Sequence, residues 1–533
     1  MKSDPLHSTD PPAVHYLVGG GIASLAAAIL LIRDAGVPGR LIRIFEQSDT
    51  LGGSLDGSGK PDTGYLVRGG RMFERHFACT FDLLASIPSI DTEGLNLKDE
   101  IDRFNREVSN SSRCRLVRSG RKVEPLRFGL NARDLRDMGR LMTQDEAALT
   151  QRSIEDCFAP AFFNTDFWFM WSTTFAFQSW HSAIELRRYF RRFVHLLPGF
   201  RRLEGILRTR YNQYDALILP ILCWLQDRGV RFETGTQVTD ARLTRDADEV
   251  RVTALHLLRE GVEEVVEITG HDRVFLTLGS MTEGSTRGSN DAPPPEPAPG
   301  GGSWELWHRL AARDPVFGRP GTFGNDIERT KWESFSVTLH NPAFFEYMEA
   351  FTGNEAGTGG LVTFTDSQWL LSIVLFRQPH YRDQPEDAFV FWGYGLHPQR
   401  RGNFTGKAMS QCSGNEILRE LAGHLHLGET SEVLLGGAQV IPCMMPHITS
   451  QFMPRGPGDR PAVIPEGARN FAVIGQFCEL PDDVVFTVEY SVRSARTAVH
   501  ALTGQGSPPP PVRRTDHDPA VLMRAARTLL RGG

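Results

Sequence analysis

The sequence lacks any cysteine pattern of the kind that binds a metal or builds a disulfide framework. Its seven cysteines are scattered and odd in number, and none forms a CxxC pair or a cysteine–histidine cluster with metal-ligand spacing. We therefore expect reduced thiols in a cytoplasmic protein, with no bound metal.

Strong net charge and long apolar runs are lacking as well. The net charge of -6 gives no global positive field, so nucleic acid is not an expected partner. The first residues lack the charged and apolar regions of a secretory signal. The apolar run at 25–32 is far shorter than the ~20 residues that cross a bilayer. It follows a glycine turn, so a buried helix is expected there.

What the sequence does contain is a βαβ beginning, followed by further short strands. Residues 14–18 and 41–46 predict buried strands, and residues 22–35 predict the helix between them. Strands are also expected at 231–234, 251–257, 273–277 and 470–475, and a helix at 489–502. This order favours an α/β fold in which a nucleotide-binding domain is built from separate parts of the chain.

The turn between the first strand and the helix reads GGGIAS. Gly19 permits the tight turn, and Gly21 lets the backbone approach a pyrophosphate at the helix N-terminus, where free N–H groups favour anions. Ser24 replaces the third glycine of the usual fingerprint and is small enough for close packing. Glu46 ends the second strand, where a carboxylate accepts hydrogen bonds from ribose hydroxyls. The pattern predicts dinucleotide binding.

Two further glycine pairs favour FAD as the dinucleotide. An acid at position 46 argues against the 2′-phosphate of NADP. The loop LGGSLD at 51–56 follows the acid-bearing strand, as in flavoproteins where a GG loop wraps the cofactor. Gly69 and Gly70 then stand where the backbone could lie against a planar ring.

Eight segments along the chain resemble the oleate hydratase family, also called the myosin-cross-reactive antigens. They keep the family's order and lie between position 14 and about position 499. The segments are GGGIASLAAA, GGSLDG, RGGRMFERHFACTFDLLASIPS, FAFQSWHSAIELRRYFRRF, RYNQYDALILP, WGYGLHP, CMMPHITSQFMPR and GQFCELPDDVVFTVEYSVRSA.

The resemblance implies an FAD-requiring hydro-lyase that adds water across the cis double bond of a free unsaturated fatty acid, without net redox. It implies a Rossmann-like, discontinuous FAD-binding domain at 14–85, 215–290 and 465–505. Substrate-binding regions are expected at 86–214 and 303–464, and a linker with a C-terminal helical tail at 506–533.

The family's proton donor corresponds to Tyr189. Protonating an alkene requires a well-placed acid, and a water must wait on the other side of the developing carbocation. His181, Glu185 and Tyr189 are spaced by four residues, so on one helix they would share a face. Either of the first two could then tune the tyrosine.

The main departure from the family is Met72, which occupies the position of the family's water-activating glutamate. A thioether cannot take a proton at neutral pH. Glu74 is the favoured replacement, with His76 and Asp56 as other candidates. The same departure leaves open a flavin-dependent oxidoreductase, a double-bond isomerase, or a catalytically weak fatty-acid-binding homologue.

The family holds the fatty-acid carboxylate with a glutamine and a TxNxxxH motif. Gln213 and His380 keep the glutamine and the histidine, whereas the threonine and asparagine positions are Val374 and Phe376. Arg377 is a candidate replacement partner for the carboxylate.

For FAD, the family pattern adds residues from four parts of the chain to Gly19, Gly21, Ser24 and the other glycines. They are Ala23, Glu46, Ser54, Arg68, Val238, Ser280, Thr487 and Ser491.

The last segment, DPAVLMRAARTLLR, has the spacing of a basic amphipathic helix. Such a helix could rest on an anionic membrane surface, where fatty acids collect, or pack on its own domain. The chain looks short at its termini beside longer family members, which favours a monomer.

Overall fold

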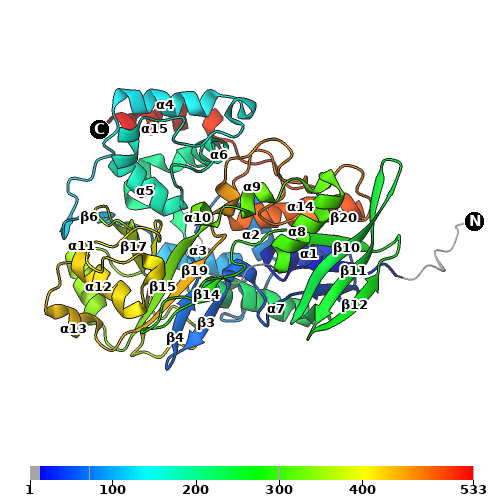
Figure 1. Cartoon of the computed structure of the whole chain (residues 1–533), viewed down its shortest axis with the longest axis horizontal. Coiled ribbons are helices and arrows are strands. Elements are labelled where there is room, and N and C mark those ends of the chain that lie inside the picture. Colours follow the sequence, from blue (N-terminus) through cyan, green and yellow to red (C-terminus); the bar gives the residue numbers. More distant parts are fainter. Residues whose placement is uncertain (1–11, 71, 298–300, 360, 532–533) are drawn as a thin grey trace, which may run out of the picture.

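The structure is a computed structural model that describes residues 12–70, 72–297, 301–359 and 361–531 (Figure 1). Arg71 of the RGGR segment and the last two residues of the expected tail lie outside the described residues.

A five-stranded parallel sheet carries the expected βαβ beginning. Its order is β20-β13-β1-β2-β9, and all four pairings are parallel. The strands are β1 (His15–Val18), β2 (Ile42–Phe45), β9 (Arg231–Glu233), β13 (Arg273–Thr277) and β20 (Phe471–Ile474). The Rossmann-like α/β class is thereby confirmed. These strands come from the three segments expected to form the FAD domain, whose boundaries stay a prediction.

Helix α1 (Ile22–Arg33) is apolar on all sides because it is enclosed. Ten of its residues, from Ile22 to Leu31, are buried. It packs against α14 (Val488–Thr503) and α7 (Leu219–Gln226), while α14 also contacts α2 (Ala78–Leu84) and β20. The C-terminal helix of the nucleotide unit therefore covers the first helix, far away in sequence.

A second, antiparallel sheet lies beside the first. It consists of β10 (Thr236–Asp246), β11 (Glu249–Arg259) and β12 (Val262–Glu267), seen at the right of Figure 1. Helix α8 (Gly302–Arg313) packs on β10.

An eight-stranded sheet, which the sequence did not predict, forms the other half of the molecule. Its order is β14-β19-β15-β18-β17-β16-β6-β7, and only the β16–β6 pair is parallel. The strands are β6 (Leu116–Arg118), β7 (Arg121–Lys122), β14 (Thr286–Arg287), β15 (Trp332–Leu339), β16 (Leu361–Phe364), β17 (Leu371–Leu375), β18 (Phe389–Gly395) and β19 (Gln439–Met445). Near it in Figure 1 lie α11 (Ala343–Thr352), α12 (Gly414–His424) and α13 (Thr430–Leu435).

A helical region lies at the upper left of Figure 1. Its main helices are α4 (Ala132–Thr143), α5 (Asp166–Phe175), α6 (Ala183–Phe193) and the 3-10 segment η5 (Val194–Arg202). Helix α3 (Leu97–Glu107) and the four-residue helices α9 (Gly321–Gly324) and α10 (Ile327–Thr330) lie elsewhere.

The expected tail helix is present as α15 (Pro519–Arg531), and it packs on η5. Val521 and Ala525 are buried, whereas Leu522, Met523 and Leu530 are exposed. Part of its apolar face is thus used within the chain. Among the described helices, none is both long and apolar enough to cross a membrane.

Two short antiparallel ribbons position the candidate site. One joins β3 (Gly57–Lys60) to β4 (Gly64–Val67), and the other joins β5 (Phe73–Glu74) to β8 (Ile206–Leu207). The second ribbon brings the segment after RGGR beside the segment before RYNQYD.

Candidate functional site

The first part of the site is a large cavity at the carboxyl ends of the parallel strands, which we call the glycine-loop cavity. It encloses about 1570 Å³. Gly19 follows β1, Glu46 follows β2 and Gly475 follows β20, and all three line it. Ligands of open α/β sheets bind at this edge.

The glycine turn forms a close backbone contact with the following GG loop. Gly19 has φ +88°, which favours glycine, and Gly21 precedes the first turn of α1. Gly52 N donates to Gly20 O at 2.9 Å. A Cβ added at Gly53 would lie 3.1 Å from the Cα of Gly21. Only glycines leave the N-terminus of α1 open to a phosphate-sized group.

Glu46 holds the turn in place from the neighbouring strand. One carboxylate oxygen accepts from Gly20 N at 2.7 Å, and the other accepts from Ser48 N at 2.9 Å. The carboxylate thus orients the glycine turn and still borders the cavity where a ribose would lie.

Most of the residues expected to bind FAD line the glycine-loop cavity. They are Gly19, Gly21, Ala23, Glu46, Ser54, Arg68, Val238, Ser280 and Ser491. Arg68 is fixed by Asp56 at 2.8 Å and by the Gly53 carbonyl at 3.0 Å.

The remaining members of the expected FAD set lie elsewhere. Ser24 is fully buried, with its hydroxyl 3.5 Å from that of Thr277. Gly69 is buried next to Gly70. Gly70 and Thr487 line a second cavity. The roles of all thirteen expected positions toward FAD stay predictions.

The second cavity, the tyrosine cavity, is walled mainly by apolar side chains and includes Tyr189, Met72 and Glu74. Tyr189 is 1% exposed, and its hydroxyl donates to the Val485 carbonyl at 2.6 Å. Its ring packs edge-on against Phe177 with centroids 4.9 Å apart. The phenol is therefore held at the cavity wall by both packing and hydrogen bonding.

A strained loop connects the tyrosine cavity to the glycine-loop cavity. Phe486 has φ +68°, a region that bulky residues rarely occupy. Its N–H donates to the side chain of Gln476 at 2.5 Å, and Gln476 in turn donates to Ser491 at 2.8 Å. Gln476 and Ser491 line the glycine-loop cavity, so a group bound there contacts the loop that holds Tyr189.

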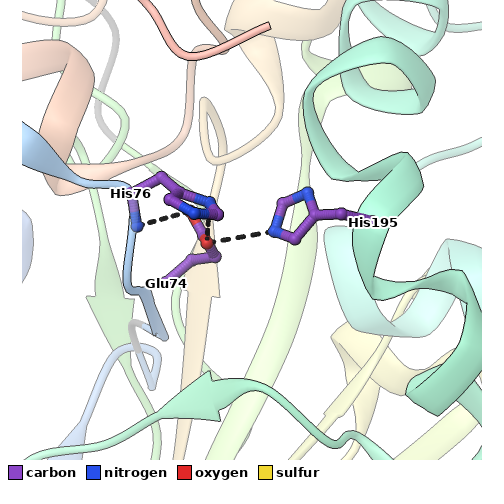
Figure 2. Close-up of side chains that lie close together, drawn as sticks. All are labelled: Glu74, His76 and His195. Carbon is purple, nitrogen blue, oxygen red and sulfur yellow. Dashed lines mark hydrogen bonds and ion pairs between the residues drawn. The ribbon is translucent and has the colours of Figure 1, made fainter. Parts of the chain in front are cut away.

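Glu74 lies between two histidines (Figure 2). It is 3% exposed, and one oxygen is 3.0 Å from His195 Nε2 and 2.6 Å from His76 Nδ1. The other oxygen is 3.4 Å from Arg192. Glu74 is thus a buried, charge-paired carboxylate.

The surroundings of Glu74 keep it ionised. Burial alone would raise its pKa, but the hydrogen bond with His195 and the charge of Arg192 lower the pKa below its usual value. The trio of Glu74, His76 and His195 has ligand atoms within 4.8 Å of one another, close enough to hold a metal ion. Since Arg192 already compensates the carboxylate, we interpret the trio as a hydrogen-bonded charge network.

The expectation that His181 shares a helical face with Glu185 and Tyr189 is wrong. The helix α6 begins at Ala183, and His181 Nδ1 instead accepts from Gln178 N at 3.0 Å. Burial lowers the pKa of His181 to about 3, so the ring is neutral.

Glu185 points away from solvent into a buried ion cluster. It pairs with Arg455 at 2.7 Å and with Arg460 at 3.1 Å. Burial alone would raise its pKa, but Arg460, Arg455 and Arg188 hold the pKa at about 2. Glu185 thus anchors the helix that carries Tyr189.

The third cavity, the arginine cavity, has about 910 Å³ of empty space, part of which is open to solvent. It adjoins the tyrosine cavity, since Gly70, Met72, Thr174 and Phe486 line both. Its other apolar walls include Trp332, Leu361 and Trp392.

All three residues expected to bind the carboxylate line the arginine cavity, and so do Val374 and Phe376. Gln213 donates to Thr209 at 3.3 Å. His380 stacks on Phe376 with centroids 3.7 Å apart, and burial and Arg208 lower its pKa to about 3. Arg377 pairs with Glu355 at 2.7 Å, and its side chain is 46% exposed. Their roles toward a substrate stay predictions.

Three lining residues escaped sequence reasoning. Trp332 and Trp392 have buried indole nitrogens without a hydrogen-bond partner among the described residues. Arg208 stands five positions before Gln213, but only the β5–β8 pairing shows that it lies at this cavity. No local pattern marks Trp332 or Arg208, and Trp392 begins the WGYGLHP segment, for which no site role was expected.

A parallel sheet with a glycine turn, an acid after the second strand and a cradle at its carboxyl edge defines a Rossmann-like dinucleotide-binding protein. The chain belongs to the MCRA family, whose model matches residues 13–500.

Two curated relatives are similar along most of their length. An oleate hydratase of Streptococcus pyogenes serotype M49 (strain NZ131) is 39% identical over 498 residues, covering 91% of this chain and 84% of the relative. A linoleate hydratase of Lactiplantibacillus plantarum is 32% identical over 559 residues, covering 96% and 98%.

Among solved structures, a protein of Exiguobacterium sp. 255-15 with a suggested protoporphyrinogen oxidase activity matches with a TM-score of 0.50 and 13% identity. The match covers 92% of this chain and 99% of that one. At this identity, the likeness concerns the fold alone.

Proposed function

We propose that the chain is an FAD-dependent hydro-lyase that adds water across the cis double bond of a free unsaturated fatty acid such as oleate, giving a hydroxy fatty acid. Membership of the MCRA family and two hydratase relatives support this proposal. The observation that carries it is that Tyr189 and Glu74 line one apolar cavity, beside a second cavity with room for an acyl chain.

FAD is the cofactor that best suits the glycine-loop cavity. Gly21 and Gly53 leave room for the pyrophosphate, Glu46 suits the ribose, and Gln476 lies on the path toward the tyrosine cavity. When bound, the flavin supplies a planar, polarisable surface and a fixed charge distribution beside the reacting double bond.

Tyr189 is the proton donor. Its hydroxyl delivers a proton to one alkene carbon, and positive charge develops on the other carbon. The apolar walls of the tyrosine cavity exclude competing nucleophiles, so the cation meets only the water that the cavity admits. Before substrate binds, the Val485 carbonyl accepts a hydrogen bond from the same hydroxyl and fixes its position.

Glu74 orients the attacking water and receives its proton. The carboxylate is ionised, lines the tyrosine cavity and is backed by His76 and His195. Met72 lines the same cavity but has no group that can accept a proton at neutral pH. The water oxygen bonds to the positively charged carbon and keeps one hydrogen, while its other proton passes to the Glu74 network. The proton gained there equals the proton that Tyr189 gave to the alkene.

The acyl chain lies along the arginine cavity, with its head group near Gln213, His380 and Arg377. His380 is neutral and can donate one N–H, while Gln213 can donate from its amide. Val374 and Phe376, the apolar residues at the family's threonine and asparagine positions, lie along the acyl chain rather than bind the carboxylate.

Incubation of the FAD-loaded protein with oleate in heavy-oxygen water tests the reaction. We expect one heavy oxygen in a hydroxy fatty acid and no consumption of an electron acceptor. Flavin bleaching or oxygen uptake would indicate an oxidoreductase, a shifted double bond without oxygen an isomerase, and tight binding without product a fatty-acid binder.

The variant Tyr189→Phe tests the proton donor. Loss of general acid catalysis should lower kcat by about 10²–10⁴-fold, while FAD content stays at the wild-type level. Steady-state kinetics with oleate measure this. Tyr347→Phe serves as the control, since Tyr347 lies on α11 and its hydroxyl donates to the Leu425 carbonyl at the end of α12. Undiminished kcat in Tyr189→Phe would remove the assignment.

We also propose that the protein works as a cytoplasmic monomer in peripheral contact with membranes. All seven cysteines are free, as in a reducing compartment. Leu522, Met523 and Leu530 of α15 are exposed beside Arg524 and could enter a bilayer interface. Light scattering and sedimentation with anionic vesicles, with and without Leu530→Ser, test these two points.

A further inference from the structure

The walls of the arginine cavity carry positive charge without negative charge. Three arginines, Arg208, Arg210 and Arg377, line it, and none of the described lining residues is an aspartate or a glutamate. The rest of the wall is largely aromatic and aliphatic. A charge in such surroundings is costly unless something compensates it.

Two of the three arginines are compensated outside the cavity. Arg377 pairs with Glu355 at the surface. Arg210 lies over the ring of Tyr211 at 5.2 Å and also lines a neighbouring cleft that contains Glu100 and Glu107. Their charges are therefore directed toward other groups.

Arg208 differs from both, since no hydrogen bond, ion pair or cation–π contact to its guanidinium is present among the described residues. Burial lowers its pKa to about 10. It still carries its charge at neutral pH. Its backbone is held on both sides by Asn105, which accepts from Arg208 N at 2.9 Å and donates to Arg208 O at 2.7 Å. A fixed backbone thus presents an uncompensated cation to the cavity.

The identity of residue 72 explains why Arg208 is uncompensated. In the β5–β8 ribbon, Phe73 pairs with Leu207 and Glu74 with Ile206. One step further, this register sets position 72 opposite position 208, and both side chains line the arginine cavity. An acid at position 72 would neutralise the guanidinium, whereas Met72 leaves the charge free.

We infer that Arg208 is the anion anchor of the arginine cavity, where it pairs with the ionised carboxylate of the fatty acid and selects it over neutral lipids. This inference rests on the proposed function for the identity of the lipid. A carboxylate relieves the cost of the unpaired cation in the cavity wall, while an alcohol or ester of the same length leaves it unpaired. Discrimination therefore comes from a penalty on the wrong head group as well as from attraction to the right one.

The first experiment compares oleate with oleyl alcohol on the full FAD-loaded chain. Trp332 and Trp392 line the cavity, so their fluorescence reports lipid binding without turnover. We expect the wild-type protein to bind oleate about 10–100-fold more tightly than the alcohol, as a charge-assisted contact worth about 1.5–3 kcal/mol implies. In Arg208→Gln this ratio should fall to about threefold or less.

The kinetic counterpart separates anchoring from chemistry. Arg208→Gln should raise KM for oleate about 10-fold or more while changing kcat much less, because Arg208 does not line the tyrosine cavity, where Tyr189 and Glu74 lie. The variant should melt no lower than wild type without lipid, since an unpaired charge is removed from a largely apolar cavity wall. Arg202→Gln is the matched control, as its side chain is 57% exposed and pairs with Glu204.

A second variant tests the same pairing from the other strand. Met72→Glu places a carboxylate opposite Arg208 and should lower oleate affinity about as much as Arg208→Gln, whereas the neutral Met72→Gln should not. An unchanged oleate-to-alcohol ratio in both Arg208→Gln and Met72→Glu overturns the inference. If the wild type binds oleate selectively but makes no hydroxy acid, the anchor stands and the hydratase proposal falls.

Discussion

The glycine-loop cavity and the arginine cavity lie in one chain but are built differently. The first lies at the strand ends of one sheet, where Gly19, Gly21 and Gly53 let the backbone come close. The second is made of side chains from distant segments, such as Met72, Arg208 and Trp392. Backbone sites depend on conformation at a few glycines, whereas side-chain sites depend on long-range packing and charge balance.

We therefore expect a single substitution to lower the free energy of unfolding most where side chains from distant segments balance one another's charge. Glu185→Gln leaves Arg455 and Arg460 without their buried counter-charge, and removing one partner of a buried pair costs about 3–5 kcal/mol. Urea unfolding monitored by tryptophan fluorescence measures the loss. Glu107→Gln, at an exposed helical pair, should change the free energy of unfolding by about 0.5 kcal/mol or less.

The pH dependence of the same variant sharpens the test. The folded protein holds the pKa of Glu185 at about 2, below its ordinary value of 4.5. The stabilisation is therefore complete above about pH 4.5 and is lost as the pH falls toward 2. Glu185→Gln should lack this part of the acid-induced loss of stability. Equal slopes in wild type and variant between these values would contradict the account.

An intermediate effect is expected at the tyrosine cavity. Glu74→Gln removes the acceptor of the water proton and should lower kcat about 100-fold, with FAD content unchanged. Turnover of oleate and the flavin spectrum measure the two quantities. Full activity in Glu74→Gln would show that another group activates the water. If the variant loses flavin, the tyrosine cavity and the glycine-loop cavity do not act independently.

The smallest effect is expected where backbone dominates. Glu46→Gln keeps an amide oxygen as the acceptor for Gly20 N but loses the charge and the acceptor for Ser48 N, so FAD affinity should fall about 10-fold. KM for oleate should not change in the FAD-saturated variant. A loss of FAD affinity larger than about 100-fold would remove the distinction between the two kinds of site.

The fold could be predicted from sequence where short apolar runs are separated by glycine. Strands β1, β2, β13 and β20 and helix α1 lie within two residues of their expected bounds. The eight-stranded sheet could not be predicted, because the sequence of its inner strand β15 does not show that the strand is buried. All eight residues of β15 are buried, yet Glu333, Ser334, Ser336 and Thr338 among them are polar. Such a strand looks like a surface segment to any hydrophobic pattern.

The candidate site divides in the same way. Gly20, between Gly19 and Gly21, donates to Glu46 within a single βαβ unit, so the spacing of the motif predicts its geometry. The role of Arg208 depends on its neighbour Met72, which lies across a ribbon that joins distant parts of the chain. Local sequence spacing does not reveal this pair. His181 was misplaced because the helix begins two residues later, a boundary that periodicity does not define.

The position of β20 in the sheet has a consequence for biosynthesis. This strand pairs with β13 and carries Gly475 at its end, but it leaves the ribosome only after more than 470 residues have been made. At about 5–20 residues per second, the strands β1 and β2 wait roughly 20–80 s for their sheet to be completed. During that time the largely apolar α1 has no α14 to cover it. Chaperone supply and translation speed, rather than FAD supply alone, should therefore set the yield of folded protein.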